Sequence, residues 1–319
     1  MLRKLLFACL AMLIVIPVSI AAKTKSDSAY SIAYVYDYTG ECEVKKKGED
    51  IAEAIQDLYI PLYEGDTLLT GDESTMEIIF DDSTMLRLDP RCKLTIKTLN
   101  RKSNNKTVVE LLKGRVIAIV KKLFEKEEFT VKTKMAMAAV KGTEFIVDAS
   151  NDDTVGVYDG AVEVSGMDMD GNVLHKIVLK KDEETIVTKK LRKPERAKRL
   201  NKDFVKRYKE VKDLRQKIQM MRDLRRSGRA KEFKLERRLK RIENLKTMMR
   251  SDPQRFRNLP AGERALVEEI MKQEPYLKAQ EESVKKDRKS RTSRLKGYLK
   301  DRKSKTQEAT EEETPEEAE

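Results

Sequence analysis

Apolar and polar residues alternate in short runs between residues 30 and 190, with Gly and Asp between the runs. A period of two indicates strands that bury one face, because successive side chains of a strand point to opposite sides. The pattern predicts strands at 31–36, 41–45, 67–70, 75–80, 84–88, 93–97, 107–112, 115–120, 128–133, 143–148, 153–158, 161–165, 173–179 and 184–188. So many short strands, with few helices between them, predict a sandwich, a barrel or a β-solenoid.

The segment 49–60, EDIAEAIQDLYI, departs from this alternation. Its apolar residues Ile51, Ala54, Ile55 and Leu58 have the spacing of a helical face. This segment therefore predicts either one short helix or a looser connection between strands.

A Lys-Gly-Thr step at 141–143 interrupts the stretch VKTKMAMAAVKGTEFIV. A phosphate-binding loop needs a glycine-rich backbone before Lys and a helix after it, but here a strand-like alternation follows. We instead expect a bend, with Gly142 permitting the turn, Ala138 and Ala139 letting two backbones pack closely, and Phe145 returning to the core.

The apolar period changes to three and four residues after Pro194. One run extends from Phe204 to Leu224 and a second from Leu235 to Met249, with Ser227 and Gly228 between them, which predicts a helical hairpin or two successive coiled-coil segments. A third helix is expected from about Pro260 until Pro275. The segment 278–305 has few apolar residues, so it is either a solvated helix or disordered.

Charge divides the chain at about residue 190. The net charge is +12, and residues 191–300 hold about 37 Lys and Arg against about 16 Asp and Glu. Such a basic arm fits an anionic membrane surface, an anionic envelope polymer or an acidic partner protein. Ordinary solvated helices with i to i+4 ion pairs would explain the charge density but not its sign. The final residues, EATEEETPEEAE, have the composition of a disordered acidic tail.

The first 22 residues have the organisation of a signal peptide. Arg3 and Lys4 precede an apolar run at 5–16, Pro17 follows it, and small residues stand at 19–22. We therefore expect an exported, periplasmic protein of the cell envelope, with an uncleaved membrane anchor as the alternative. Nucleic acid is disfavoured in that compartment, and the arm has no aromatic stacking platform.

Two cysteines remain after such a signal, Cys42 and Cys92. In an oxidising compartment they form either a disulfide or two separately buried thiols, and the sequence leaves both open.

The sequence shows no catalytic or metal-binding constellation. His175 is the only histidine, and the two cysteines lack a CxxC spacing. The segment DMDGN at 168–172 lacks most ligands of a calcium loop, so we expect a hairpin turn there, as at Lys113-Gly114 and Asp159-Gly160. We therefore expect no enzyme activity and no cofactor.

Four blocks between 64 and 166 carry a resemblance to a known family: EGDTLLTGDESTMEIIFDDSTMLRLDPRCKLTI, VVELLKGRVIAIV, FTVKTKMAMAAVKGTEFIV and TVGVYDGAVEVSG. In order and spacing they resemble the FecR domain, a periplasmic module of transmembrane regulators. The positions that match its motifs and are expected to be structural are Gly65, Gly71, Gly114, Gly142, Thr143, Phe145 and Gly160. Asp82, Lys134 and Lys141 depart from the family's usual Gly, Pro and Arg.

The resemblance implies a mainly β fold, a curled or solenoid-like stack of short strands, used for protein or ligand binding and not for catalysis. Family regulators contact a sigma factor through a cytoplasmic segment. About four residues precede the apolar run here, so we expect no such contact.

These observations predict a signal peptide at 1–22, a FecR-like β domain at 23–190 with its core at 64–188, a basic helical, coiled-coil-like arm at 191–300 and a disordered tail at 301–319. The function expected is that of a non-enzymatic envelope protein whose β domain binds a protein or ligand and whose arm contacts an anionic surface or acidic partner. The alternative is a periplasmic helical chaperone or stress protein with a β scaffold. Self-association through the helices is left open.

Overall fold

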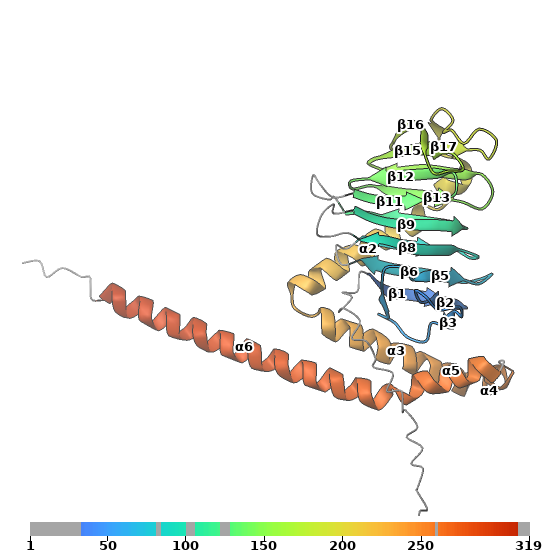
Figure 1. Ribbon diagram of the computed structural model, residues 1–319. Coiled ribbons are helices and arrows are strands. Elements are labelled where there is room, and N and C mark those ends of the chain that lie inside the picture. Colours follow the sequence, from blue (N-terminus) through green and yellow to red (C-terminus); the bar gives the residue numbers. More distant parts are fainter. Residues whose placement is uncertain (1–32, 81–83, 100–105, 122–127, 259–260, 312–319) are drawn as a thin grey trace, which may run out of the picture. The chain divides into compact units, whose positions relative to one another are not determined.

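The computed structural model describes residues 33–80, 84–99, 106–121, 128–258 and 261–311 (Figure 1). Within these ranges the strands form two nine-stranded sheets. Sheet A contains, in spatial order, β18 (Lys198–Arg199), β17 (Glu183–Val187), β14 (Asp153–Asp159), β13 (Glu144–Asp148), β10 (Arg115–Ile119), β7 (Met85–Leu88), β6 (Thr75–Phe80), β1 (Ala33–Thr39) and β4 (Pro61–Leu62).

Sheet B lies beside sheet A, and the strands of both sheets follow one another in the same direction. Its spatial order is β16 (Val173–Lys180), β15 (Ala161–Met167), β12 (Ala136–Val140), β11 (Glu128–Lys132), β9 (Lys106–Lys113), β8 (Lys93–Leu99), β5 (Thr67–Thr70), β2 (Cys42–Lys45) and β3 (Glu53–Ala54). In both sheets the strand numbers rise toward the same end, except that β4 lies outside β1 and β3 outside β2. The chain therefore forms most of the stack in order of sequence. Strands β9 and β11 run parallel, whereas β8 and β12 pair antiparallel with them.

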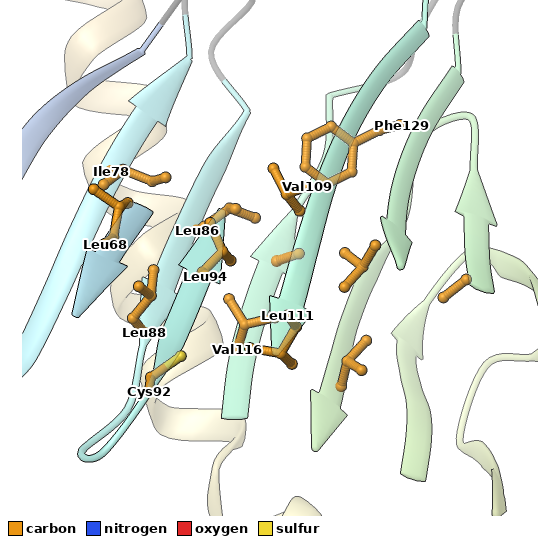
Figure 2. Packing of buried hydrophobic residues seen from close by; sticks show 14 of the residues in the cluster. Leu68, Ile78, Leu86, Leu88, Cys92, Leu94, Val109, Leu111, Val116 and Phe129 are labelled. Atoms are coloured by element: carbon orange, nitrogen blue, oxygen red, sulfur yellow. The ribbon is translucent and has the colours of Figure 1, made fainter. Parts of the chain in front are cut away.

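Sheet A is apolar on both faces, which explains why its strands read as nearly continuous apolar runs. In β10, Val116 and Ala118 face the core between the sheets, whereas Ile117 and Ile119 belong to a second cluster on the opposite face. Figure 2 shows the first of these clusters, with Val116 beside Leu111 of sheet B. The second cluster needs a cover, and helices supply it.

Six helices follow the strands in the described ranges: α1 (Lys202–Lys206), α2 (Tyr208–Arg226), α3 (Ala230–Ser251), α4 (Pro253–Arg257), α5 (Ala261–Lys272) and α6 (Glu274–Glu311). The apolar stripe of α2, with Val211, Leu214, Ile218 and Met221, packs on the outer face of sheet A. Helix α3 instead shares a small cluster with α5 and α6, which contains Leu235, Ile242, Ile270 and Leu277. The main partner of the first helical run is therefore the sheet, whereas the second run packs with α5 and α6.

All the expected strands are present, with ends moved by a few residues, and four others are added. The most informative addition is β12, in which Ala138 pairs with Val131 and Val164. The sequence pattern predicts no strand at Ala138 and Ala139, but these residues belong to a strand that lies between two others. The bend itself lies at 141–143, as expected.

The helix considered at 49–60 is not formed. Residues 53–54 pair with β2, and Ile55 donates its N–H to the carbonyl of Cys42 at 2.8 Å. Ile55 and Leu58 do face the core, so their spacing was informative about burial but not about backbone.

Two domain boundaries also move. Strand β18 extends the β domain to Arg199. Helix α6 continues to Glu311, through part of the segment expected to be disordered, and Pro275 lies in its first turn, where a missing N–H costs no hydrogen bond. The signal peptide expected at 1–22 and the part of the expected tail beyond residue 311 lie outside the described residues. None of the helices in the described ranges combines the length and apolarity that crossing a bilayer requires.

Candidate interaction surfaces

The family-motif residues hold turns and strand ends. Gly114 and Gly160 both have φ of +89°, and a Cβ at Gly114 would lie 2.7 Å from the Cα of Cys92. Thr143 donates its hydroxyl to the carbonyl of Ala161 at 2.8 Å, and Phe145 is fully buried. The N–H groups of two further motif glycines, Gly65 and Gly71, donate to the carbonyls of Ile96 and Glu41.

Cys42 and Cys92 are both free and buried. Strand β5 lies between them, since Thr70 pairs with Cys42 and donates its N–H to the carbonyl of Cys92. Two strand spacings are about 9.5 Å, which exceeds the Cα separation of about 7 Å that a disulfide spans. The structure therefore contains two separately buried thiols and no disulfide between Cys42 and Cys92. Burial raises the pKa of the Cys42 thiol to about 12 and that of Cys92 as well.

A buried carboxylate fixes the turn between β11 and β12. Asp153 accepts hydrogen bonds from the Thr133 hydroxyl and from the N–H of Met135, the latter at 3.1 Å. Burial raises the pKa of Asp153, and these hydrogen bonds oppose the shift only in part. The role of this carboxylate is therefore to hold the turn in place. Among the described residues, no group of three His, Cys, Asp or Glu side chains could hold a metal ion.

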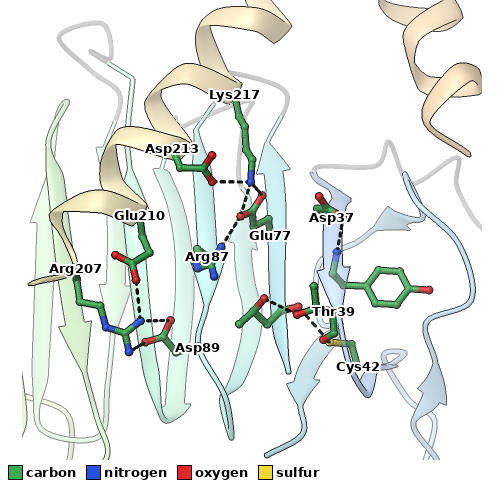
Figure 3. Close-up of polar contacts among 12 residues, drawn as sticks. Asp37, Thr39, Cys42, Glu77, Arg87, Asp89, Arg207, Glu210, Asp213 and Lys217 are labelled. Carbon is green, nitrogen blue, oxygen red and sulfur yellow. Dashed lines mark hydrogen bonds and ion pairs between the residues drawn. The ribbon is translucent and has the colours of Figure 1, made fainter. Parts of the chain in front are cut away.

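Helix α2 is tied to sheet A by charge as well as by apolar contact (Figure 3). Lys217 Nζ lies 2.8 Å from a carboxylate oxygen of Glu77, which also accepts from Arg87 at 2.7 Å. Arg207 pairs with Asp89 at 3.0 Å. Glu77 and Asp89 are nearly inaccessible to solvent, and burial raises the pKa of Asp89.

Helix α3 lies against three tyrosines of β1. Lys234 Nζ is 4.5 Å from the ring centroid of Tyr34, the Arg237 guanidinium is 4.4 Å from that of Tyr36, and the Arg241 guanidinium is 3.9 Å from that of Tyr38. These three contacts fall within the usual range of cation–π interactions. We call this arrangement the tyrosine row.

The sequence contains both halves of the tyrosine row, although the pattern analysis did not single them out. Tyrosines occupy alternate positions 34, 36 and 38, and the cations follow helical spacing at 234, 237 and 241. Nothing in either pattern alone says that the two face each other.

Many cations of the first three helices are thus neutralised by the β domain. On α2, Arg215 also bonds Glu144 at 2.6 Å. On α3, Arg237 bonds Asp37 at 2.8 Å and Arg238 bonds Asp57. The slight acidic excess of the β domain and the basic excess of the helices therefore complement each other within one chain. This pairing explains in part why the helices carry an excess of positive charge, which the need for soluble helices does not explain.

Some basic residues of α6 pair with acidic side chains of the helices, as Arg288 does with Glu232, but others do not. Lys286, Lys289, Arg294 and Lys296 are exposed, and none forms an ion pair with a described side chain. Helix α6 therefore offers cations that the fold does not use.

A cavity of about 420 Å³ adjoins the bend at 141–143. Gly142 and Thr143 form one side of it, and Arg215, Gln219 and Arg222 of α2 form another. Two of the family-motif residues thus border a cavity, although their own hydrogen bonds are internal to the β domain.

The comparisons with known proteins identify the β domain. Residues 66–163 match the family model described as "FecR protein". Two solved structures of a "putative anti-sigma factor" from Parabacteroides distasonis share 21% identity and a TM-score of 0.37 with this chain. The match covers 44% of this chain and 63% of the other chain. No curated protein matches the sequence.

Proposed function

Because residues 66–163 form a FecR domain, we propose that this protein is an exported, non-enzymatic component of the cell envelope. Its β domain makes the specific contact with a protein or ligand, and its helical arm contacts an anionic surface or an acidic partner. The signal-like residues 1–22 support the compartment.

The observation that carries the second half of this proposal is the difference between the helices. The paired cations of α2 and α3 are occupied by carboxylates of the β domain, such as Glu77 and Asp37. The exposed cations of α6 at 286, 289, 294 and 296 have no such partner among the described side chains. This difference favours α6 as the part of the arm that makes the anionic contact.

The test uses the full chain with four charge reversals on α6, Lys286→Glu, Lys289→Glu, Arg294→Glu and Lys296→Glu. A matched control reverses four exposed lysines of the β domain, Lys93, Lys113, Lys189 and Lys190, so that both variants have the same net charge. Removing the arm is a poor test, because a chain that ends after Lys190 lacks α2 and uncovers the apolar outer face of sheet A.

The measurement is co-sedimentation with purified envelope fractions across a salt series. We expect the wild type and the control to pellet at low salt and to be released as salt rises, because exposed charges are screened. The α6 variant should stay in the supernatant. Equal pelleting of all three proteins would show that α6 does not anchor the protein.

A further inference from the structure

A cavity of about 390 Å³ lies between α3 and α6, next to Tyr59 of the β domain. Its lining consists of Lys231, Lys234, Leu235 and Arg238 from α3, Gln280, Ser283 and Val284 from α6, and Tyr59. The site is separate from the family-motif residues and from the exposed cations of α6 described above.

The charged part of this lining is of one sign. Lys231, Lys234 and Arg238 are all cationic, and none of the described residues that line the cavity is acidic. Arg238 is held in place by Asp57, which accepts from its Nε at 3.0 Å, and by Gln273 at 3.3 Å. Lys231 is exposed and forms no ion pair with a described side chain. A cation in a concave site without a counter-ion favours an anionic ligand.

The rest of the lining is apolar or neutral. Leu235 belongs to the small cluster between α3 and α6, and Val284 packs against that cluster. Burial raises the pKa of Tyr59, so its phenol stays neutral at physiological pH. The ring of Tyr59 also lies 5.0 Å from Lys234 Nζ. A ligand that fills the cavity therefore needs an anionic group next to an apolar part.

The backbone conformation of Tyr59 also supports a ligand-binding site here. Tyr59 has φ of +62°, a left-handed backbone conformation that residues other than Gly rarely adopt. Its N–H donates to the carbonyl of Val35 at 2.6 Å, and its hydroxyl accepts from Arg237 at 3.1 Å. The surrounding contacts thus hold this ring in place against a local backbone cost, as is common for residues at ligand sites.

We propose that this cavity binds the phosphodiester headgroup of an anionic phospholipid. The phosphate oxygens would contact Lys231 and Lys234, and the carbons next to the headgroup would lie against Leu235 and Val284. A hydroxyl-rich anionic glycan would satisfy the cations but not the apolar side chains, so the lipid fits better. The inference rests on the proposed envelope function and names the partner of the arm.

The experiment is flotation of the full chain with vesicles of phosphatidylglycerol and phosphatidylcholine, and with vesicles of phosphatidylcholine alone. Lys231→Glu is compared with Lys240→Glu, which makes the same change of charge at an exposed lysine nine residues further along α3. Nine residues correspond to about half a turn beyond full turns, so Lys240 lies on the opposite side of the helix. Both residues are exposed, and unchanged thermal unfolding of the two variants is checked first.

We expect the wild type to float with the anionic vesicles only. Lys231→Glu should weaken this binding about 25-fold, since it changes the charge by two units and each unit near an anionic surface contributes roughly a factor of five. Lys240→Glu should stay within about twofold of the wild type, because it lies outside the cavity. A soluble short-chain phosphatidylglycerol, which has both the phosphodiester and the apolar carbons, should compete more effectively than inorganic phosphate at equal concentration.

Three results would overturn the proposal. An equal loss in the two variants would mean that net charge alone matters, and equal flotation with neutral vesicles would remove the role of the phosphate. Equal competition by inorganic phosphate would indicate a site for free anions instead of a lipid. Comparison with the α6 variant separates the two proposals. If reversal on α6 releases the protein and Lys231→Glu does not, the anchoring proposal stands and the lipid site is refuted. If Lys231→Glu releases the protein and reversal on α6 does not, the lipid site stands and anchoring by α6 is refuted.

Discussion

The Arg241 guanidinium lies 3.9 Å from the ring centroid of Tyr38, and the same kind of contact recurs at Arg237 with Tyr36 and at Lys234 with Tyr34. The register of β1 shifts between Val35 and Asp37, and Tyr36 and Tyr38 belong to different apolar clusters, yet cations three and four residues apart on α3 reach all three rings. Helix α3 is therefore positioned on the β domain by cations over aromatic rings, in addition to the ion pair between Arg237 and Asp37.

Replacing Arg241 by Met keeps an unbranched apolar stem and removes the cation over Tyr38. We expect Arg241→Met to lower the free energy of unfolding by about 1 kcal/mol, the usual size of a partly buried cation–π contact. Urea denaturation measures this change. The exposed neighbour serves as control, since Lys240→Met should leave the midpoint unchanged. Wild-type stability of Arg241→Met would show that the ring contact contributes nothing.

Glu77 and Lys217 should respond unequally to neutralisation, although they form one ion pair. Glu77→Gln leaves Arg87 and Lys217 without their shared carboxylate, and we expect a loss of about 3 kcal/mol in the free energy of unfolding. Lys217→Met leaves Glu77 paired with Arg87, so we expect a loss of about 1 kcal/mol or less. Both are measured by urea denaturation, with the exposed Glu73→Gln as control. A larger loss for Lys217→Met would contradict this order.

Asp153 should make the protein relatively more stable as the pH falls from neutral. Its pKa in the folded state lies above the ordinary value of 3.8, so the folded state binds the proton more tightly than the unfolded state does. The contribution of this group to stability therefore increases as pH falls through the raised pKa, and it is lost at higher pH. Thermal unfolding of the wild type and of Asp153→Asn from pH 7 to 4 tests this.

We expect Asp153→Asn to be the more stable of the two at pH 7, with the difference shrinking or reversing toward pH 4. Asp153→Ala removes the acceptor of the Thr133 hydroxyl and the Met135 N–H, so it should cost about 1–3 kcal/mol at either pH. A difference between wild type and Asp153→Asn that does not vary with pH would refute the shift.

The thiols of Cys42 and Cys92 should be unreactive in the folded protein. Burial raises both pKa values, so the thiolate that reacts with alkylating agents is scarce at neutral pH. Mass spectrometry after treatment with iodoacetamide should find both residues unmodified under native conditions and both modified in denaturant. A disulfide that links the two peptides after folding under oxidising conditions would show that the strands on either side of β5 can move together.

The β domain was largely predictable, because its contacts are local in sequence. Strands such as β6 and β7 pair with their neighbours in the chain, so short-range alternation and turn residues determine most of the order. The alternation failed at β12, where Ala138 and Ala139 gave too weak an apolar contrast to distinguish a strand from a bend. It also failed at 53–58, where helical spacing occurred in an extended backbone.

The interaction surfaces were less predictable, because their partners lie far apart in sequence. Arg237 is 200 residues from Asp37, and Lys217 is 140 residues from Glu77. Charge counts showed the basic sign of the second half, but not that carboxylates of the first half neutralise part of it. Likewise, the apolar stripe of α2 was evident, whereas its partner, the outer face of sheet A, is visible only when the strands are assembled.

The separation of the tyrosine row from α3 along the chain has a consequence for biosynthesis. Tyr34, Tyr36 and Tyr38 emerge early, and Arg237 follows Asp37 by 200 residues. At about 5–20 residues per second, the ribosome adds that length in about 10–40 s. The first strand therefore spends that interval without its covering helix, and any factor that holds it during synthesis or export has to release it before α3 can dock.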